Sequence, residues 1–305
     1  MKPDGSGSSV LLLGASGFLG PALLDAFGGA RAVKTHCKHP VNGSRFFDAR
    51  TTHISDVLAA LPGKPAAAVI LLGITDIDKC ARDPAGSAEV NVRGIIRVID
   101  EARALGIMPV FVSSDAVFDG SGAYWSEDDE PIPILTYGRQ KLEVERHLAA
   151  LPPPWIIVRL PKLISPERNA RCLLSGWAEG LGRRRRILCA TDQYFTPAAV
   201  PDAARAIAQL VQARAQGLYH LGGPERLSRR DLLGAVLDEY RKFEKPIAEV
   251  VDCSLRDIPV LEPRPLDTSL RSERFKADFG TSFRAAGEVA RAAVQSYFAA
   301  RDCGK

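Results

Sequence analysis

The sequence contains no long apolar run, no closely spaced cysteine pair and no strong excess of charge. Its six cysteines are scattered, without a Cys-x-x-Cys pair, which predicts reduced thiols in a cytoplasmic protein and argues against a disulfide framework. A net charge of +4 over 305 residues is too small to indicate nucleic-acid binding as the main function. We expect the Gly/Ser-rich residues 1–9 to form a loose tail. The apolar stretch after them is short, so it predicts neither a signal peptide nor a membrane span.

What the sequence does contain is an alternation of apolar and amphipathic segments. Strands are predicted at residues 10–13, 31–38, 46–48, 67–73, 110–112 and 155–158, and helices at 22–27, 52–61, 88–105 and 137–150. A polar loop is expected at 76–82. This alternation predicts an α/β fold with a Rossmann-type, doubly wound parallel sheet. With 46% apolar and 25% charged residues, the chain has the composition of an ordinary soluble globular protein.

The pattern changes after residue 160, where glycine, proline and arginine become frequent and the segments shorten. We therefore predict a dinucleotide-binding domain at 1–160 and a smaller C-terminal substrate domain at 161–305, interleaved because residues 192–222 return to the larger domain. The acidic, turn-rich residues 117–133 are expected to form a flap over the site. The four arginines at 183–186 are interpreted as a solvated turn, with attraction of a diphosphate as the alternative.

A glycine-rich turn joins the first predicted strand to the first predicted helix. Its glycines would let the backbone approach a pyrophosphate, and the helix N-terminus would supply amide groups and a favourable dipole. An ordinary tight turn is the alternative. We predict dinucleotide binding, with contacts from this loop: Gly14, Ser16, Gly17, Phe18, Leu19 and Gly20.

The end of the second predicted strand indicates which dinucleotide is bound. Residues 34–39, where a carboxylate would bind the ribose 2′-hydroxyl of NAD, contain no carboxylate. Lys38 is expected to meet a 2′-phosphate, which favours NADP(H) and leaves NAD(H) open; a solvated loop lysine is the alternative. Asp48 is placed to touch the adenine. His36 and His39 have no third ligand nearby, so no metal site is predicted.

Tyr137 and Lys141 are the residues that most strongly indicate which reaction the chain catalyses. Residues four apart lie on the same face of a helix, so the Lys141 ammonium would stand beside the Tyr137 phenol and favour the phenolate. Ser114 follows the strand at 110–112, at the edge where open α/β sheets bind ligands. The three side chains together would polarise a carbonyl and protonate it as a hydride arrives, which is what a ketone reductase needs.

Further motifs run from residue 10 to the C-terminal helix. They are Gly14-x-x-Gly17-x-x-Gly20, Thr75-Asp76-x-Asp78-Lys79-Cys80, Asn91-Val92-x-Gly94, Ser113-Ser114-Asp115-Ala116-Val117-Phe118-Asp119-Gly120, Tyr137-Gly138-x-x-Lys141, Asp192-Gln193, Gly217-Leu218-Tyr219-His220-Leu221-Gly222-Gly223 and Arg264-Pro265-x-Asp267. Together they resemble the extended short-chain dehydrogenase/reductase family, and within it the dTDP-4-dehydrorhamnose reductase-like subfamily, which binds sugar nucleotides.

The resemblance implies NADPH-dependent reduction of the keto group of a nucleotide-linked sugar. Tyr137 would be the general acid, Lys141 would lower its pKa and bind the nicotinamide ribose, and Ser114 would polarise the carbonyl. Asn91 would help to position its helix and a proton path. The further cofactor contacts expected are Leu72, Gly73, Ile74, Ser113 and Leu160, and the expected substrate contacts are Thr75, Asp78, Asp115, Ala116, Phe118 and Arg264.

The sequence also departs from the subfamily. Ala116 stands where the family often has tyrosine, which removes a ring from the wall of the site, and residues 72–74 replace the common Asn-Ala-Ala. Cys80 is interpreted as a packed thiol. These departures leave the sugar, the nucleotide and the pathway open.

Two alternatives remain at this stage. The first is an epimerase or dehydratase of the same fold, although Asp115 is the only acid directly after the serine. The second is a non-catalytic NADP-binding regulatory subunit like the β subunit of methionine adenosyltransferase. The expected partner is a nucleoside-diphosphate sugar, with no nucleic acid and no membrane; a homodimer is left open.

Overall fold

The structure of the chain, a computed structural model, describes residues 9–29, 32–59, 61, 63–167, 170 and 172–302. Nearly all of the expected N-terminal tail lies outside these residues. The chain divides into two units. The first comprises Met1–Ser114, Thr136–Arg159 and Ala204–Tyr219, and the second comprises Asp115–Leu135, Leu160–Ala203 and His220–Lys305. Their assignment to dinucleotide and substrate binding stays a prediction.

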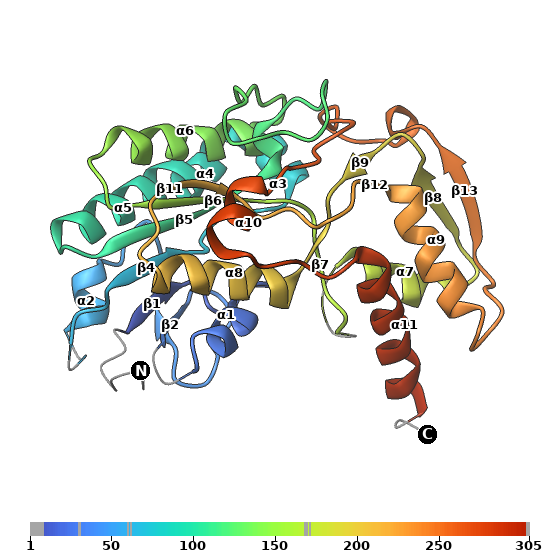
Figure 1. The fold of residues 1–305 in the computed structure, drawn as a ribbon, viewed down its shortest axis with the longest axis horizontal. Coiled ribbons are helices and arrows are strands. Elements are labelled where there is room, and N and C mark those ends of the chain that lie inside the picture. Colours follow the sequence, from blue (N-terminus) through green and yellow to red (C-terminus); the bar gives the residue numbers. More distant parts are fainter. Residues whose placement is uncertain are drawn as a thin grey trace. The chain divides into compact units, whose positions relative to one another are not determined.

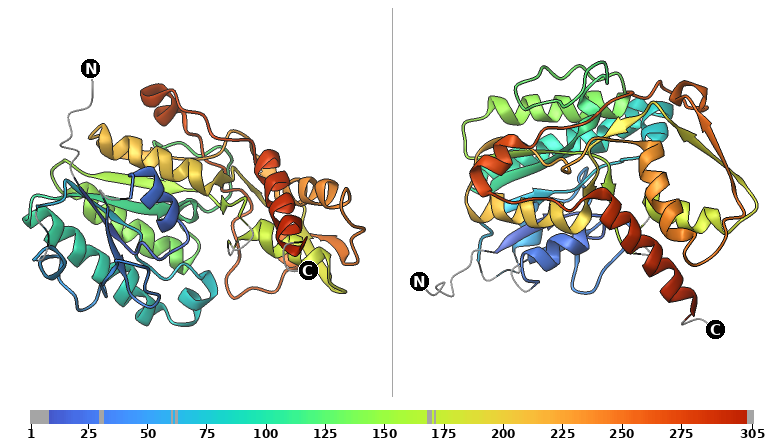
Figure 2. Two further views of the ribbon diagram at one scale, coloured as in Figure 1. Left: turned by 90° about the horizontal axis from the view of Figure 1, so that it is seen from below. Right: turned by 45° about the vertical axis from the view of Figure 1, so that its right-hand side comes forward.

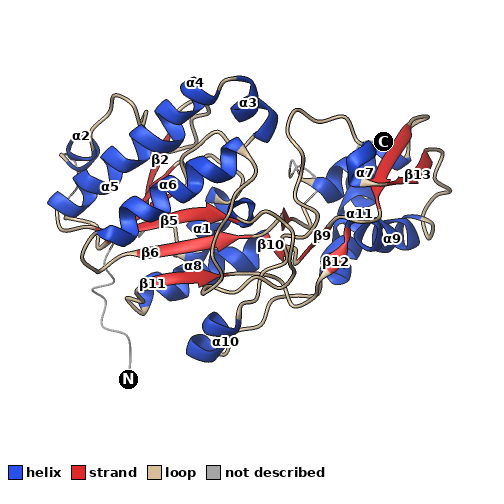
Figure 3. Cartoon of the chain, turned by 90° about the horizontal axis from the view of Figure 1, so that it is seen from above, coloured by secondary structure: helices blue, strands red, loops and turns tan. Residues whose placement is uncertain are grey.

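A seven-stranded sheet with the order β11-β6-β5-β4-β1-β2-β3 forms the centre of the first unit. Neighbours from β3 to β5 pair in parallel, and the arrows of β5, β6 and β11 point the same way in Figure 3. This confirms the predicted Rossmann-type sheet, in which the strand order reverses between β1 and β4. The strands are β1 (Val10–Leu13), β2 (Ala32–His36), β3 (Arg45–Phe46), β4 (Ala67–Ile70), β5 (Met108–Ser114), β6 (Ile156–Leu160) and β11 (Gly217–His220).

Helices cover both faces of this sheet, which explains why β1 and β4 are fully buried and apolar. A core that includes Leu11, Ile70 and Phe111 packs one face against α2, α5 and α6. Figures 1 and 2 show α1 and α8 on the other face. The helical elements of this unit are α1 (Gly20–Ala26), α2 (Ile54–Leu58), α3 (Ile77–Arg82), α4 (Pro84–Ala88), the π-helical turn η1 (Glu89–Gly94), α5 (Ile95–Ala104), α6 (Thr136–Ala150) and α8 (Val200–Gln212), whose first turn falls in the second unit.

The second unit is built from short paired strands and three core helices. A separate apolar core includes Trp177, Leu232, Tyr240 and Val294. These residues come from α7 (Leu173–Leu181), α9 (Arg229–Tyr240) and α11 (Ala286–Asp302). The remaining elements are β7 (Leu163–Ile164), β8 (Arg186–Ala190), β9 (Tyr194–Phe195), β10 (Ala198–Ala199), β12 (Leu227–Ser228), β13 (Glu249–Cys253), the 3₁₀ turns η2 (Asp115–Val117) and η3 (Leu255–Asp257), and α10 (Glu273–Phe279).

The acidic segment at 117–133 is anchored in the second unit. The Trp125 N–H donates to the Ser269 carbonyl at 2.7 Å, and the Arg271 N–H donates to the Trp125 carbonyl at 2.7 Å. The Trp125 ring stacks on Phe118 with centroids 4.6 Å apart. The role of this segment as a flap stays a prediction.

Two of the predicted elements differ from the structure. The expected polar loop at 76–82 is wrong, because residues 77–82 form α3, whose N-cap Asp76 accepts a hydrogen bond from the Lys79 N–H at 3.0 Å. The segment lacks the apolar periodicity that reveals longer helices. The predicted helix at 88–105 begins with the π-helical turn η1 and becomes α-helical only at Ile95.

Candidate active site

Tyr137 and Lys141 lie one turn apart near the start of α6, as their spacing predicts. Both side chains are buried, with exposed fractions of 8% and 4%. The Lys141 Nζ atom lies 5.7 Å from the centroid of the Tyr137 ring and 4.7 Å from that of Phe111. It also donates a hydrogen bond to the Val112 carbonyl at 2.9 Å. The ammonium therefore joins α6 to β5 while standing close to the phenol.

Strand β5 carries the predicted serine to the same edge of the sheet. Ser114 is its last residue, two positions after the Val112 carbonyl that binds Lys141. Alternate residues of a strand share a face, and Val112 and Ser114 are both half-buried whereas Ser113 between them is buried. The carboxyl end of β5 thus brings Ser114 and the α6 pair into one region of the first unit.

Burial changes the acidity of the lysine. Desolvation lowers the pKa of Lys141 from 10.5 to about 8, although the nearby Glu145 carboxylate opposes the change. Glu145 itself pairs with Arg159 of β6 at 2.7 Å, and both side chains are buried. At pH 7 most Lys141 side chains still carry the charge that stabilises a phenolate.

Asn91 connects the loop after β4 to the same helix. Its Oδ1 accepts from the Ile74 N–H at 2.6 Å, and its Nδ2 donates to the Ile74 carbonyl at 3.0 Å and to Gln140 Oε1 at 2.8 Å. Gln140 Nε2 in turn donates to Ser87 Oγ at 2.7 Å. Asn91 is 1% exposed, so its amide fixes the position of loop and helix; its predicted part in a proton path stays a prediction.

The loop that Asn91 holds needs a glycine. Gly73 has a φ of +143°, and a Cβ there would lie 3.1 Å from Asn91 Oδ1. The conformation and the close contact together exclude a larger residue without a shift.

A groove of about 780 Å³ lies in the first unit, over the switch point of the sheet. The predicted cofactor residues that line it are Gly14, Ser16, Gly17, Lys38, Asp48, Leu72, Gly73 and Ile74, joined by the predicted substrate residue Thr75. Sequence reasoning missed other lining residues, among them Arg50 and Arg82. The two arginines lacked a motif that could have revealed them.

The glycine turn has the geometry that close approach of a pyrophosphate requires. Gly14 has a φ of +91°, and its N–H donates to Thr35 Oγ1 at 3.0 Å. A Cβ on Gly20 would lie 2.0 Å from the Ala15 carbonyl oxygen, so the first turn of α1 packs directly on the loop. Leu19 is buried and Phe18 is exposed, and neither lines the groove.

The predicted cofactor residue Asp48, which lines the groove, and the nearby His36 already have protein partners. Asp48 forms a bidentate ion pair with Arg50, at 3.0 and 2.6 Å. This hydrogen bonding holds the pKa of Asp48 below its usual value. His36 shares a hydrogen bond of 2.7 Å with Ser44 Oγ. The contact of Asp48 with adenine stays a prediction.

The remaining predicted residues lie in several places. Asp78 is on α3, and Leu160, at the end of β6, falls in the second unit. Also in the second unit, Asp115 accepts from Thr268 Oγ1 at 2.7 Å. Ala116 and Phe118 are buried, so they pack the interior. Arg264 lines a cavity of about 710 Å³ together with Arg256, Pro259 and Pro263.

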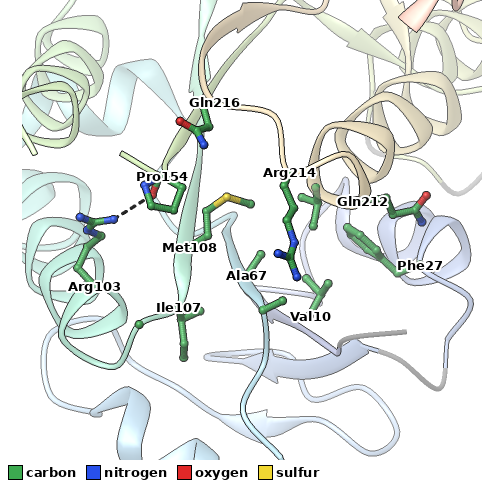
Figure 4. Close-up of a pocket in the computed structure, with 13 residues that line it drawn as sticks. Val10, Phe27, Ala67, Arg103, Ile107, Met108, Pro154, Gln212, Arg214 and Gln216 are labelled. Atoms are coloured by element: carbon green, nitrogen blue, oxygen red, sulfur yellow. Dashed lines mark hydrogen bonds between the residues drawn. The ribbon is translucent and has the colours of Figure 1, made fainter. Parts of the chain in front are cut away.

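Another cavity, of about 740 Å³, lies at the amino ends of β1, β4 and β5 (Figure 4). Its wall carries Arg103 and Arg214 among mainly apolar residues. The Arg103 guanidinium donates to the Pro154 carbonyl at 3.0 Å. No predicted site residue lines this cavity, and ligands of such sheets bind at the opposite, carboxyl edge.

The family model of the RmlD substrate binding domain matches residues 8–299. The chain belongs to this family. The match confirms the resemblance to the RmlD-like, dTDP-4-dehydrorhamnose reductase-like part of the extended short-chain dehydrogenases/reductases.

Two relatives and one solved structure illustrate the family. A dTDP-4-dehydrorhamnose reductase of Aggregatibacter actinomycetemcomitans is 27% identical over 285 residues, which cover 89% of this chain and 93% of that protein. Methionine adenosyltransferase 2 subunit beta of Xenopus tropicalis is 25% identical over 256 residues, covering 81% and 76%. The crystal structure of a hypothetical dTDP-4-dehydrorhamnose reductase from Sulfolobus tokodaii has a TM-score of 0.79 at 25% identity, covering 92% and 98%. The same scaffold therefore serves proteins with different names and roles.

None of the helices in the described part of this RmlD-family chain combines the length and the apolar character that crossing a bilayer requires.

Replacing the buried Lys141 tests how much its charge lowers the stability of the fold. Lys141→Met is expected to raise the free energy of unfolding at pH 7 by about 2 kcal/mol. A pKa of about 8 instead of 10.5 corresponds to a cost of about 3 kcal/mol, and the lost hydrogen bond to Val112 offsets about 1 kcal/mol. Because the folded-state pKa is the lower one, the cost is full below pH 8 and is lost as the pH rises through 10.5. Urea denaturation at pH 7 and pH 10 measures the difference, and an equal gain at both pH values would contradict this explanation.

A variant of the amide network tests whether the loop after β4 and helix α6 are coupled. Gln140→Leu is expected to lower the free energy of unfolding by about 2 to 3 kcal/mol, because it leaves the Asn91 amide and the Ser87 hydroxyl buried without this partner. Arg139→Leu, at the exposed neighbouring position, is the matched control and should change stability by about 0.5 kcal/mol or less. Urea denaturation measures the free energy of unfolding of both variants. Equal values for Gln140→Leu and Arg139→Leu would refute the coupling between the loop and α6.

Proposed function

We propose that this chain uses NADPH to reduce the keto group of a nucleotide-linked sugar. The observation that carries the proposal is the pairing of Tyr137 with the buried Lys141, which is bonded to the strand that ends at Ser114. A purely structural helix gains nothing from burying an ammonium at this cost. Its family relatives named as dTDP-4-dehydrorhamnose reductases support the same reaction class.

In this mechanism each side chain acts on the carbonyl oxygen. Ser114 donates a hydrogen bond to that oxygen and holds it near Tyr137. The phenol of Tyr137 gives its proton to the oxygen as negative charge develops there. Lys141 stabilises the resulting phenolate, whose proton is then restored from solvent. When bound, NADPH supplies the hydride that reaches the carbonyl carbon.

The residues of the groove fit a phosphorylated dinucleotide. Gly14 and Gly20 allow the close backbone approach that a pyrophosphate needs. Lys38, His39 and Arg50 line the same groove, and residues 34–39 include no carboxylate that would repel a 2′-phosphate. NADP(H) is therefore the preferred cofactor. Within the described part of the chain, Lys141 donates to one acceptor, Val112, which leaves ammonium donors for the nicotinamide ribose.

A second candidate is a cofactor-binding regulatory subunit. The similarity to methionine adenosyltransferase 2 subunit beta favours it. Such a subunit would bind NADPH in the same groove without turning over a keto sugar. The two functions therefore differ in turnover and agree in cofactor binding.

The catalytic role of the phenol has a direct test. Tyr137→Phe is expected to lower turnover at least about a hundredfold, because the variant has no proton to donate, while NADPH binding changes little. The assay follows NADPH absorbance with a panel of nucleotide-linked 4-keto sugars. Tyr297→Phe on α11 is the matched control and should keep full activity. Unchanged turnover in Tyr137→Phe refutes the mechanism, and tight NADPH binding without turnover of any sugar favours the regulatory subunit.

The cofactor preference depends on a cation at the groove. Lys38→Ala is expected to weaken NADPH binding about tenfold, the equivalent of one charge-assisted phosphate contact, with little effect on NADH. Lys34→Ala is the control, because Lys34 donates to the Asn42 carbonyl at 3.0 Å and does not line the groove. Fluorescence titration measures both affinities. Tighter binding of NADH than of NADPH by the unmodified protein would overturn the assignment.

A further inference from the structure

The cavity of about 740 Å³ at the amino ends of β1, β4 and β5 lies entirely within the first unit, on the edge of the sheet opposite the cofactor groove (Figure 4). Val10, Ala67 and Met108, the first residues of these strands, form its floor, and they pair in register, Val10 with Ala67 and Ala67 with Met108. Phe27 and Val211 add an apolar wall. Cavities of this size with apolar walls and a few polar groups are typical of small-molecule sites.

The charged groups of this cavity are all of one sign. Arg103, in the last turn of α5, and Arg214, just after α8, line it, and its described lining residues include no carboxylate. The Arg103 guanidinium donates to the Pro154 carbonyl at 3.0 Å, which leaves its other N–H groups for a ligand. A Cβ on the lining residue Gly106 would lie 3.1 Å from Lys64 Nζ, so a third cation stands at the rim. The cavity therefore combines an apolar floor with a positively charged rim.

Arg214 occupies a backbone position that usually belongs to glycine. Its φ is +52°, in the left-handed region that side chains other than glycine and asparagine rarely adopt. Helices α1 and α5 also end beside this cavity, and with the same pair of capping hydrogen bonds they carry Gly28 and Gly106 at this position. The Arg214 guanidinium forms no hydrogen bond or ion pair within the described part of the chain, and Figure 4 shows it extending toward the strand floor. A charged side chain kept in a strained conformation points to a functional constraint.

The helix dipole gives a simpler reason for cations at these places, because a positive charge stabilises a helix C-terminus. In both helices, however, backbone N–H groups already cap the last carbonyls. The Gly106 N–H donates to the Arg103 carbonyl at 2.9 Å, and the Arg214 N–H donates to the Val211 carbonyl at 3.1 Å. The Arg103 guanidinium instead binds the loop at Pro154. A role at the dipole affects stability and a role at the cavity affects binding, so measurement separates the two.

We propose that this cavity binds a small amphipathic anion, with a carboxylate or phosphate group held by Arg103 and Arg214 and an apolar body packed on the strand floor around Met108. A guanidinium binds two oxygens of such a group at once. Gln212, which also lines the cavity, offers an amide for a further polar atom of the ligand. Cofactor and substrate of a Rossmann-type sheet bind at the carboxyl edge, so this ligand is a third molecule. The proposal is therefore independent of the proposed reductase function.

Binding of a fluorescent amphipathic anion to the full chain tests this proposal without turnover. The probe is anilinonaphthalene sulfonate, whose sulfonate stands in for the carboxylate or phosphate, and it is compared with the uncharged phenylnaphthylamine. Saturating NADP⁺ keeps both probes out of the cofactor groove. The charged probe is expected to bind at least about tenfold more tightly than the uncharged one, and Arg214→Gly and Arg103→Met should each remove about tenfold of its affinity without changing that of the uncharged probe. Arg146→Gln, exposed on α6 and outside the cavity, is the matched control and should bind like the unmodified protein.

Stability and cavity filling separate binding from folding. Without a probe, the thermal midpoint of Arg214→Gly should stay within about 2 °C of that of the unmodified protein, because glycine relieves the left-handed backbone but also loosens the unfolded chain. Arg214→Lys keeps a positive charge and should retain part of the affinity. Ala66→Trp fills the cavity from an exposed lining position and should abolish binding of both probes, whereas Ala104→Trp, exposed on α5 outside the cavity, is its control. If Arg214→Gly does not fold, Arg103→Met and Ala66→Trp decide.

The head group is then identified by displacement of the bound sulfonate probe. Octanoate, octyl phosphate or both should displace it at least about tenfold more effectively than octanol, which has the same chain without the charge. Equal affinity for the charged and the uncharged probe, unchanged binding in both arginine variants, or displacement by octanol as effective as by the anions overturns the proposal. A midpoint lowered by Arg214→Gly with unchanged probe binding assigns Arg214 to the helix dipole and also overturns it. Neither the presence nor the absence of turnover alters these outcomes, so this site and the reductase are tested separately.

Discussion

One buried hydrogen bond, from the Lys141 ammonium to the Val112 carbonyl, determines where the candidate chemistry takes place. It joins α6, which carries Tyr137, to β5, which ends at Ser114. Burial makes the charge costly and useful for the same reason: away from bulk water, the ammonium acts on the phenol more strongly than it would at the surface. The lowered pKa of Lys141 is the measure of that cost. A methionine here would suit the core better and would leave the phenol with its ordinary acidity.

The hydrogen-bonded amides of Asn91 and Gln140 hold α6 in place from a second side. Asn91 forms two hydrogen bonds with the backbone of Ile74 and a third with Gln140 of α6. The loop at Gly73 and Ile74 also lines the cofactor groove. The loop that lines the groove and helix α6 are therefore fixed by the same buried network, which originates in a π-helical turn, a feature frequent at functional sites.

The sequence predicted those parts of the fold and site that depend on local spacing. The turn from Gly14 to Gly20 and the interval from Tyr137 to Lys141 each imply their geometry directly, because strand, turn and helix follow one another in the chain. Partners distant in sequence could not be predicted in this way. Asn91 and Gln140 are 49 positions apart, and the ion pair that engages Asp48 depends on a side-chain rotamer of Arg50 that no pattern specifies. The burial of Phe118 likewise depends on Trp125 and on tertiary packing within the second unit.

The arginines show most clearly that the number of adjacent positive residues in a sequence does not determine how well their charges are balanced in the structure. Four arginines are adjacent at residues 183–186, yet Arg183 and Arg186 are exposed and pair with carboxylates, and such solvated ion pairs contribute little to stability. Arg229 stands outside that run, next to Arg230, which pairs with Asp252. Strand pairing and the packing of α9 place Arg229 beside the Trp177 ring, where its side chain is half-buried. The burial and the pairing of each arginine in the fold therefore set its electrostatic cost, and the number of arginines in a segment does not.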